Sequence, residues 1–146
     1  MFVATTIAAG ERSGCLVGFA TQCSIDPARF LVCVSDKNRT HRVLERGAQA
    51  MAVHVVPADA GDLVELFGGE TGDEQDKFDQ CDWHEGPLAL PLLDRCASWF
   101  AGPIVDRVAL GDHVGYVVEP SHARADYDGP VFPFSWAKEV EPGHEA

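Results

Sequence analysis

Polar side chains with the makings of an anion site gather in one short stretch, directly before a predicted helix. The stretch holds hydroxyls, an amide and two cations, carried by Ser35, Lys37, Asn38, Arg39 and Thr40. Hydroxyls, cations and the free N–H groups of a helix start are the ingredients of a phosphate site. The same residues also fit a solvated turn in which Asn38 caps the helix, so both interpretations stay open.

A second stretch with a chemical use lies just upstream, at the end of a mostly apolar run. Its side chains are largely small: Gly18, Phe19, Ala20, Thr21, Gln22, Cys23 and Ser24. A flat ring can lie against such a strand, because few bulky side chains would hold it away from the backbone amides. Small residues also suit a tight barrel interior, which is the alternative interpretation.

Histidine and cysteine add little further chemistry. His113 follows Asp112 before a predicted strand, where it either takes part in a reaction or simply hydrogen-bonds Asp112. Cys81 and His84 have C-x-x-H spacing, but no second pair of ligands stands at a suitable distance, so no metal site is predicted. No catalytic triad or carboxylate pair is apparent.

Charge and cysteine usage limit the partners. The formal net charge is -12, from 23 acidic and 11 basic residues, which argues against nucleic acid or an acidic membrane. A phosphorylated cofactor remains compatible, because a few basic groups at one spot suffice. Five cysteines without C-x-x-C spacing, and a start that does not look like a secretory leader, predict reduced thiols in a cytoplasmic protein.

The 146 residues fit one domain, and their patterning is mainly that of short strands. Predicted strands cover residues 2–8, 15–23, 30–34, 50–56, 88–92, 97–110, 114–119 and 131–136. Short helices are predicted over 41–46, 62–67 and 73–78, and a loop over 121–129. Tight links between the first strands indicate an antiparallel meander, and Gly102-Pro103 marks a bulge or barrel corner. We therefore expect a closed or nearly closed β-barrel with helices outside it.

The order of these segments resembles the flavin reductase family of FMN-binding split barrels. The resemblance is carried first by residues 14–41, which read G-C-L-V-G-F-A-T-Q-C-S-I-D-P-A-R-F-L-V-C-V-S-D-K-N-R-T-H. Leu66-Phe67, Lys77-Phe78 and Gly111-Asp112-His113 before a strand ending in Glu119 look like later landmarks of the family. It implies a mainly β fold, an antiparallel, Greek-key-like split β-barrel with short peripheral helices, over residues 1–138. Residues 139–146 are expected to form an acidic tail.

The resemblance also implies a cofactor and a reaction. FMN would lie along residues 18–24, with its phosphate at Arg39 and Thr40, closed by Thr21 and Gln22. Phe78 would stand beside the ring, and His113 near the nicotinamide of NADH or NADPH, which passes hydride from its C4 to flavin N5. The family further implies a homodimer and a flavin-dependent monooxygenase or other acceptor of reduced flavin. A non-catalytic FMN-binding protein, or a split barrel using a deazaflavin or haem, is the alternative.

Overall fold

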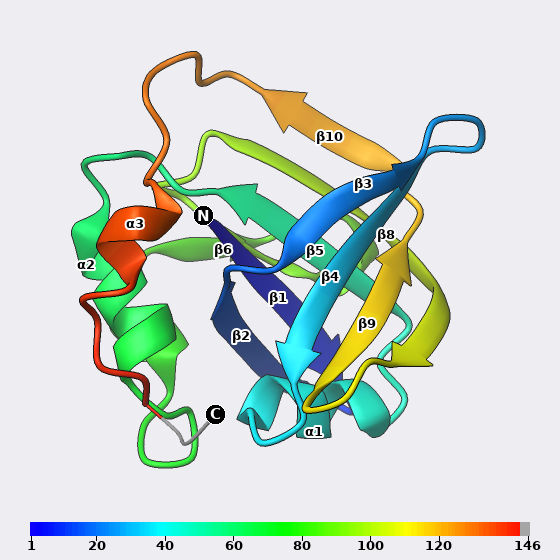
Figure 1. Cartoon of the computed structure of the whole chain (residues 1–146), viewed down its shortest axis with the longest axis horizontal. Helices are drawn as coiled ribbons and strands as arrows, with labels where there is room; N and C mark the ends of the chain where they lie inside the picture. The colour runs from blue at the N-terminus through cyan, green and yellow to red at the C-terminus, as the bar shows by residue number, and fades with distance from the viewer. Residues whose placement is uncertain (144–146) are drawn as a thin grey trace.

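The computed structural model describes residues 1–143, and its main secondary structure is a set of ten strands (Figure 1). The strands are β1 (Phe2–Ala8), β2 (Glu11–Val17), β3 (Ala20–Ser24), β4 (Arg29–Ser35), β5 (Ala50–Val55), β6 (Trp83–Glu85), β7 (Pro91–Leu93), β8 (Ser98–Ala109), β9 (His113–Val118) and β10 (His122–Ala125). The helical segments are α1 (Arg39–Glu45), α2 (Gly61–Val64), a π-helical turn (Glu65–Gly69), two 3-10 turns (Lys77–Asp79 and Pro87–Ala89) and α3 (Phe134–Ala137).

The main sheet is antiparallel throughout and curls into a barrel that is open on one side. Its strand order is β2-β1-β5-β8-β9-β4-β3, with β10 added to the first half of β8. The long strand β8 pairs with β5 through residues 99–103 and with β9 through residues 104–109, so it links the two halves of the sheet. The mainly β split-barrel fold is thereby confirmed.

The predicted corner at Gly102-Pro103 lies inside β8, where the strand turns from one partner to the next. A Cβ on Gly102 would lie only 1.8 Å from the carbonyl oxygen of Glu119, so the backbones meet too closely for any side chain. The register shift itself falls between Ile104 and Asp106, one residue after the proline. Glycine is therefore required at the point where β8 passes the end of β9.

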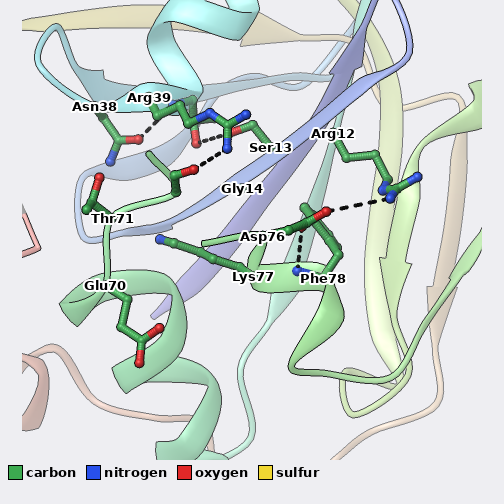
Figure 2. Close-up of a pocket in the computed structure, with 12 residues that line it drawn as sticks. Arg12, Ser13, Gly14, Asn38, Arg39, Glu70, Thr71, Asp76, Lys77 and Phe78 are labelled. Carbon is green, nitrogen blue, oxygen red and sulfur yellow. Dashed lines mark hydrogen bonds and ion pairs between the residues drawn. The ribbon is translucent and has the colours of Figure 1, made fainter. Parts of the chain in front are cut away.

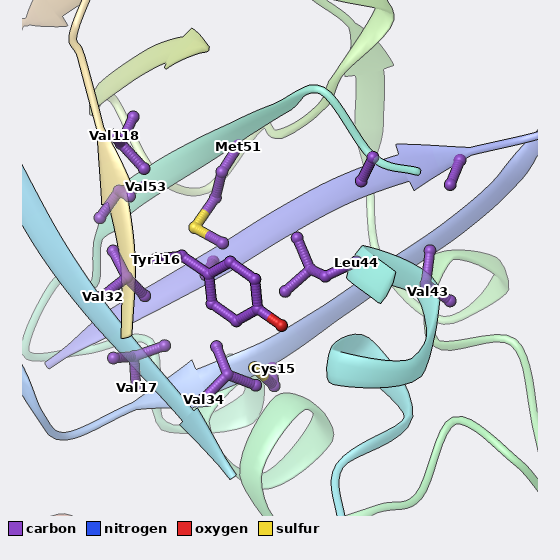
Figure 3. Close-up of a cluster of buried hydrophobic side chains, with 13 residues drawn as sticks. Cys15, Val17, Val32, Val34, Val43, Leu44, Met51, Val53, Tyr116 and Val118 are labelled. Carbon is purple, nitrogen blue, oxygen red and sulfur yellow. The ribbon is translucent and has the colours of Figure 1, made fainter. Parts of the chain in front are cut away.

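Two apolar clusters stabilise this arrangement. The barrel interior holds thirteen buried residues around Tyr116, drawn in Figure 3. The Tyr116 hydroxyl donates to Glu45 of α1 (3.0 Å) and meets His41 Nδ1 (2.7 Å), so the one polar atom of that ring is satisfied. A second cluster, centred on Phe67 and Phe78, packs α2 and the π-helical turn against the outside of the barrel.

Local signals explain the ends of several elements. Asn38 is the N-cap of α1, with its side-chain oxygen accepting from the Thr40 N–H (2.8 Å), which confirms the capping interpretation. Gly47 follows the helix with φ of 100°, a conformation that favours glycine. Ala9-Gly10 turns the chain between β1 and β2 with positive φ at both residues.

Five predictions about elements are wrong. The predicted helix over residues 73–78 is only the 3-10 turn Lys77–Asp79, preceded by turns. The run 15–23 is not one strand: β2 ends at Val17 and β3 begins at Ala20, on the opposite end of the strand order. Residues 122–125 of the predicted loop form β10, because the first half of β8 has a free edge to pair with. Residues 131–136 make only one bridge, from Val131, before α3 begins. The predicted strand 88–92 is divided between the 3-10 turn Pro87–Ala89 and the start of β7 at Pro91. None of the helices within residues 1–143 is long and apolar enough to span a membrane.

Candidate functional site

Two hollows adjoin each other on the open side of the barrel. Both are bounded by β2 and by the chain that runs from β4 into α1, and the segment after α2 closes them from outside. Residues 12–14 line the first hollow and residues 15, 16, 18 and 19 line the second. We call them the polar hollow and the apolar groove, and they meet along β2.

The polar hollow combines cations, hydroxyls and a helix start (Figure 2). Its volume is about 20 Å³, and besides two carboxylates, Glu70 and Asp76, its lining includes Arg12, Ser13, Asn38, Arg39, Thr40, Thr71, Lys77 and Phe78. The Ser13 and Thr40 hydroxyls lie 2.9 Å apart and are both buried. The structure thus brings together three members of the predicted elbow, Asn38, Arg39 and Thr40, with the predicted Phe78.

Lys77 is the most unusual charge in the polar hollow. Its side chain is only 6% exposed, and Figure 2 shows it pointing into the hollow on the side of Thr71. The ammonium donates to the Phe67 carbonyl (3.1 Å), and no carboxylate among residues 1–143 forms an ion pair with it. Because an ammonium has three donors, two remain available to a ligand. Burial lowers the pKa of Lys77, and the negative charge of Glu70 nearby acts in the opposite direction without cancelling this effect.

Arg12 adds a second unsatisfied donor to the same hollow. Its Nε is buried and has no hydrogen-bond partner among the described residues. Its guanidinium stacks 4.5 Å from the centroid of the Trp83 ring, which fixes the plane of the group. A single buried donor of this kind costs free energy unless something accepts from it. Arg12 Nη2 forms an ion pair with Asp76 (3.8 Å), and Figure 2 shows its guanidinium on the opposite side of the hollow from the Lys77 ammonium, so Lys77 is the cation that an anion there would meet.

Arg39, in contrast, is already paired within the chain. Its Nη2 donates to Glu11 Oε1 (2.6 Å), and its Nη1 donates to the Gly72 carbonyl. Arg42 pairs in the same way with Asp73, on the loop that covers the hollow. These contacts hold residues 70–76 down over the polar hollow, so Arg39 would have to exchange partners to reach an anion.

The apolar groove is larger and lies between β2 and β4. Its volume is about 270 Å³, with buried Cys15 and Val34 at its floor. Burial raises the pKa of the Cys15 thiol to about 11, so this sulfur stays protonated at neutral pH. The groove is thus an apolar slot wide enough for a flat ring.

Four of the predicted site residues line the apolar groove: Gly18, Phe19, Ser35 and His113. The His113 ring lies edge-on to Phe19, with centroids 5.3 Å apart. Its Nδ1 lies 2.7 Å from Asp112 Oδ1, which orients the imidazole and leaves Nε2 free of this contact. The hydrogen bond and charge of His113 lower the pKa of Asp112.

The remaining predicted residues lie elsewhere. Lys37 and all of β3 line neither hollow. The Thr21 hydroxyl donates to the Gln22 carbonyl (3.3 Å) and the Gln22 amide to the Ser24 carbonyl (3.1 Å), both on the exposed strand surface. Ala20 is half-buried against the barrel core, and Cys23 is exposed. Within residues 1–143, no three His, Cys, Asp or Glu side chains gather closely enough to hold a metal ion.

Comparison with known proteins identifies the family and supports the fold. The model of the flavin reductase like domain matches residues 1–138. This chain belongs to that family. The stachydrine N-demethylase reductase subunit of Rhizobium meliloti (strain 1021) is 30% identical over 114 residues, which are 75% of this chain and 48% of that protein.

Two further proteins are similar to this chain, one in sequence and one in structure. The 4-hydroxyphenylacetate 3-monooxygenase reductase component of Escherichia coli is 28% identical over 75% of this chain and 66% of its own length. The crystal structure of an FMN-binding protein from Thermus thermophilus superposes with a TM-score of 0.77 at 25% identity, covering 84% of this chain and 67% of that one. The chain therefore spans about half to two-thirds of the length of these relatives.

The chemistry of the two hollows matches the two ends of a flavin mononucleotide, although the polar hollow is too small in this conformation to admit a phosphate group. A flavin mononucleotide has a flat, largely apolar ring and a phosphate at the far end of its ribityl chain. The apolar groove suits the ring, and the buried Lys77 ammonium and the Ser13–Thr40 hydroxyl pair in the adjoining polar hollow suit a phosphate. Both hollows lie along one strand, so a single molecule could occupy them together.

Several lining residues were not predicted from the sequence. Arg12 and Ser13 belong to a stretch taken as a hairpin turn, and Lys77 was noted only as the neighbour of Phe78. Phe134 and Lys138 line the apolar groove from the C-terminal segment. A buried lysine carries no local signal, since its burial arises from the packing of the second apolar cluster above it. The only local signal near Arg12 was the pair Gly10 and Gly14 with polar residues between them, and this signal predicted a turn and not a binding site.

Proposed function

We propose that this protein is an NAD(P)H-dependent flavin reductase that binds FMN. The observation that carries the proposal is the buried Lys77 ammonium, without a paired carboxylate among residues 1–143, at the end of an apolar groove of ring size. A phosphate dianion would supply the missing charge. When bound, the flavin ring supplies the hydride acceptor, N5, and the nicotinamide C4 supplies the hydride.

The chain's own residues have binding and orienting tasks in this reaction. The apolar groove excludes water from the ring, because its floor is formed by buried Cys15 and Val34. Lys77 and the Ser13–Thr40 hydroxyl pair would hold the phosphate. His113, oriented by Asp112, would place its Nε2 at the groove, where it can hydrogen-bond the nicotinamide carboxamide.

Phosphate entry requires the covering loop to move. A hollow of about 20 Å³ has room for about one water molecule, which is too little for a phosphate group. Residues 70–76 are held by Arg39 and Arg42 through the Gly72 carbonyl and Asp73, and these links lie near the surface. We infer that the loop opens and that Arg39 then turns from Glu11 toward the phosphate.

We also propose a homodimer that covers the outer face of β4, β9 and β8. Leu31 and Leu110 close over Gly115 on this face, and Val108 beside them is 40% exposed. Such a patch is usually covered in an oligomer, and this one adjoins Phe19 of the apolar groove. A cytoplasmic location remains our proposal, consistent with the free thiols of all five cysteines.

The names of two relatives suggest the class of protein that accepts the reduced flavin. Two of them are named as reductase subunits or components of an N-demethylase and of a monooxygenase. We propose that the present protein likewise delivers reduced flavin to an oxygenase component.

Absorbance spectra and nucleotide oxidation test the proposal directly. The purified protein is titrated with FMN, FAD and riboflavin, and NADH and NADPH oxidation is followed with and without FMN. We expect FMN to bind more tightly than riboflavin and to be required for oxidation. A protein that binds FMN but oxidises neither nucleotide would be a non-catalytic carrier. A protein that binds only a deazaflavin or haem would contradict the FMN assignment.

A further inference from the structure

The C-terminal segment forms a strap across the mouth of the apolar groove. It leaves the barrel after Phe132, whose N–H donates to the Val56 carbonyl (2.8 Å), and returns at Gly143, whose N–H donates to the Gly68 carbonyl (3.1 Å). Figure 1 shows this red segment descending from α3 on the side of α2. Residues 133–142 between the two anchors are what we call the strap.

The strap is weakly held at its start. α3 has four residues, no side-chain cap and no buried residue. The amides of Trp136, Glu139 and Val140 bond to carbonyls three residues earlier, as in isolated turns. Such a short helix has little stability of its own, so its opening costs little.

Phe134 of the strap fits a seat that Gly18 provides. A Cβ at position 18 would lie 2.8 Å from Phe134 Cε2, so glycine is what allows the ring to rest on the backbone. Gly18 itself does not have positive φ, and its backbone conformation would accept other residues. The missing side chain is therefore explained by the ring above it.

This seat adjoins the residue expected to meet the nicotinamide. Phe134 lies 6.2 Å from the Phe19 ring, which lies 5.3 Å from His113. Phe134 and Phe19 are 46% and 56% exposed, whereas the groove floor is buried. The seat is thus at the mouth of the groove, where a nicotinamide ring would enter and stack on a flavin ring bound deeper in the groove.

We propose that Phe134 is the gate of the nicotinamide site, and that the nicotinamide ring takes its seat over Gly18 when the strap opens. The inference rests on the proposed function and assigns a specificity-determining residue to it. When the nicotinamide ring replaces the Phe134 ring, the groove stays covered. The free-energy cost of nicotinamide binding is therefore only the exposure of the Phe134 ring to water. For a ring already half exposed, that cost weakens nucleotide binding about fivefold.

Substitution of Phe134, with Trp136 as a matched control, tests the gate. Trp136 lies on the same helix with 56% exposure, but its ring packs on Phe132 and does not line the apolar groove. We expect Phe134→Ala to lower KM for NADH about fivefold, with kcat and the Kd for FMN within twofold of wild type. Trp136→Ala should leave all three unchanged.

Hydrogen exchange supplies a readout that does not depend on turnover. NAD⁺, which cannot deliver a hydride, is added to the FMN-loaded wild-type protein, and exchange of a peptide covering residues 133–143 is followed. The amides of Trp136, Glu139 and Val140 should exchange faster with NAD⁺ than without it, because the strap opens.

Each result decides the matter. An unchanged or raised KM in Phe134→Ala, an equal fall in Trp136→Ala, or strap exchange that does not respond to NAD⁺ overturns the gate while leaving the reductase intact. A wild-type protein that neither binds FMN nor oxidises NADH contradicts the proposed function and the gate together.

Discussion

Replacement of Lys77 by methionine separates phosphate recognition from ring recognition. Methionine keeps the length and much of the packing of the lysine stem but removes the ammonium. A hydrogen bond to a charged group contributes about 1.5–3 kcal/mol. Since 1.4 kcal/mol is a factor of ten, the Kd for FMN should rise about 10- to 150-fold. Riboflavin, which lacks the phosphate, should bind Lys77→Met and wild type equally.

The same variant should be more stable without flavin. The Lys77 ammonium is 6% exposed and has a single carbonyl partner among the described residues, so its desolvation is poorly compensated. Removing an uncompensated buried charge is stabilising when the replacement packs well. Urea denaturation of the apoprotein should therefore show a higher midpoint for Lys77→Met.

Fluorescence titrations with FMN and riboflavin provide the assay, and Lys37→Met is the control. Lys37 is a neighbouring lysine of the elbow that lines neither hollow. The reasoning is refuted if Lys77→Met binds FMN as wild type does. It is equally refuted if the variant loses FMN and riboflavin affinity in parallel, because the lysine would then support the ring site or the fold.

Three other perturbations follow from the structure. Arg39→Ala should weaken FMN binding by about 1 kcal/mol, which is less than the effect of Lys77→Met, because Arg39 must first leave Glu11. Titration of both variants with FMN compares the two effects. Burial lowers the pKa of His54 to about 4 from 6.5, so the neutral form stabilises the fold above pH 6.5, and this stability is lost as the pH falls toward 4. Urea unfolding at pH 7 and pH 5 should show the advantage of wild type over His54→Gln shrinking by about 2 kcal/mol, and a constant difference would contradict the buried neutral ring. Gly102→Ala should destabilise the protein by about 3 kcal/mol or prevent folding, since its Cβ would meet the Glu119 carbonyl; an unchanged urea midpoint would show that β8 can shift.

Much of the secondary structure was predictable because its signals are local. Asn38 before a helix and Gly47 after it mark the ends of α1, and both act as predicted. Short apolar runs bounded by turn residues located β1, β4, β5, β8 and β9. The same local view failed at Val131, where one bridge and a helix replace a strand, because pairing depends on a partner edge that periodicity does not reveal.

The elbow shows where local chemistry stops being informative. Its residue types suggested an anion site, and Asn38, Arg39 and Thr40 do line a polar hollow. The charge of Arg39, however, is matched by Glu11, 28 residues away, while the unmatched charge belongs to Lys77. Which cation is free depends on how the segment after α2 folds back, and no short-range spacing encodes that.

Residue order alone was enough to indicate a flavin-family barrel with a basic bend before its first helix. It could not show that the chain crosses at Gly18-Phe19 from one end of the sheet to the other, leaving a groove between β2 and β4. Nor could it show Phe134 resting on Gly18, 116 positions earlier in the chain. Contacts of this range form only when the whole barrel closes, because burial and edge pairing depend on segments that share no local pattern.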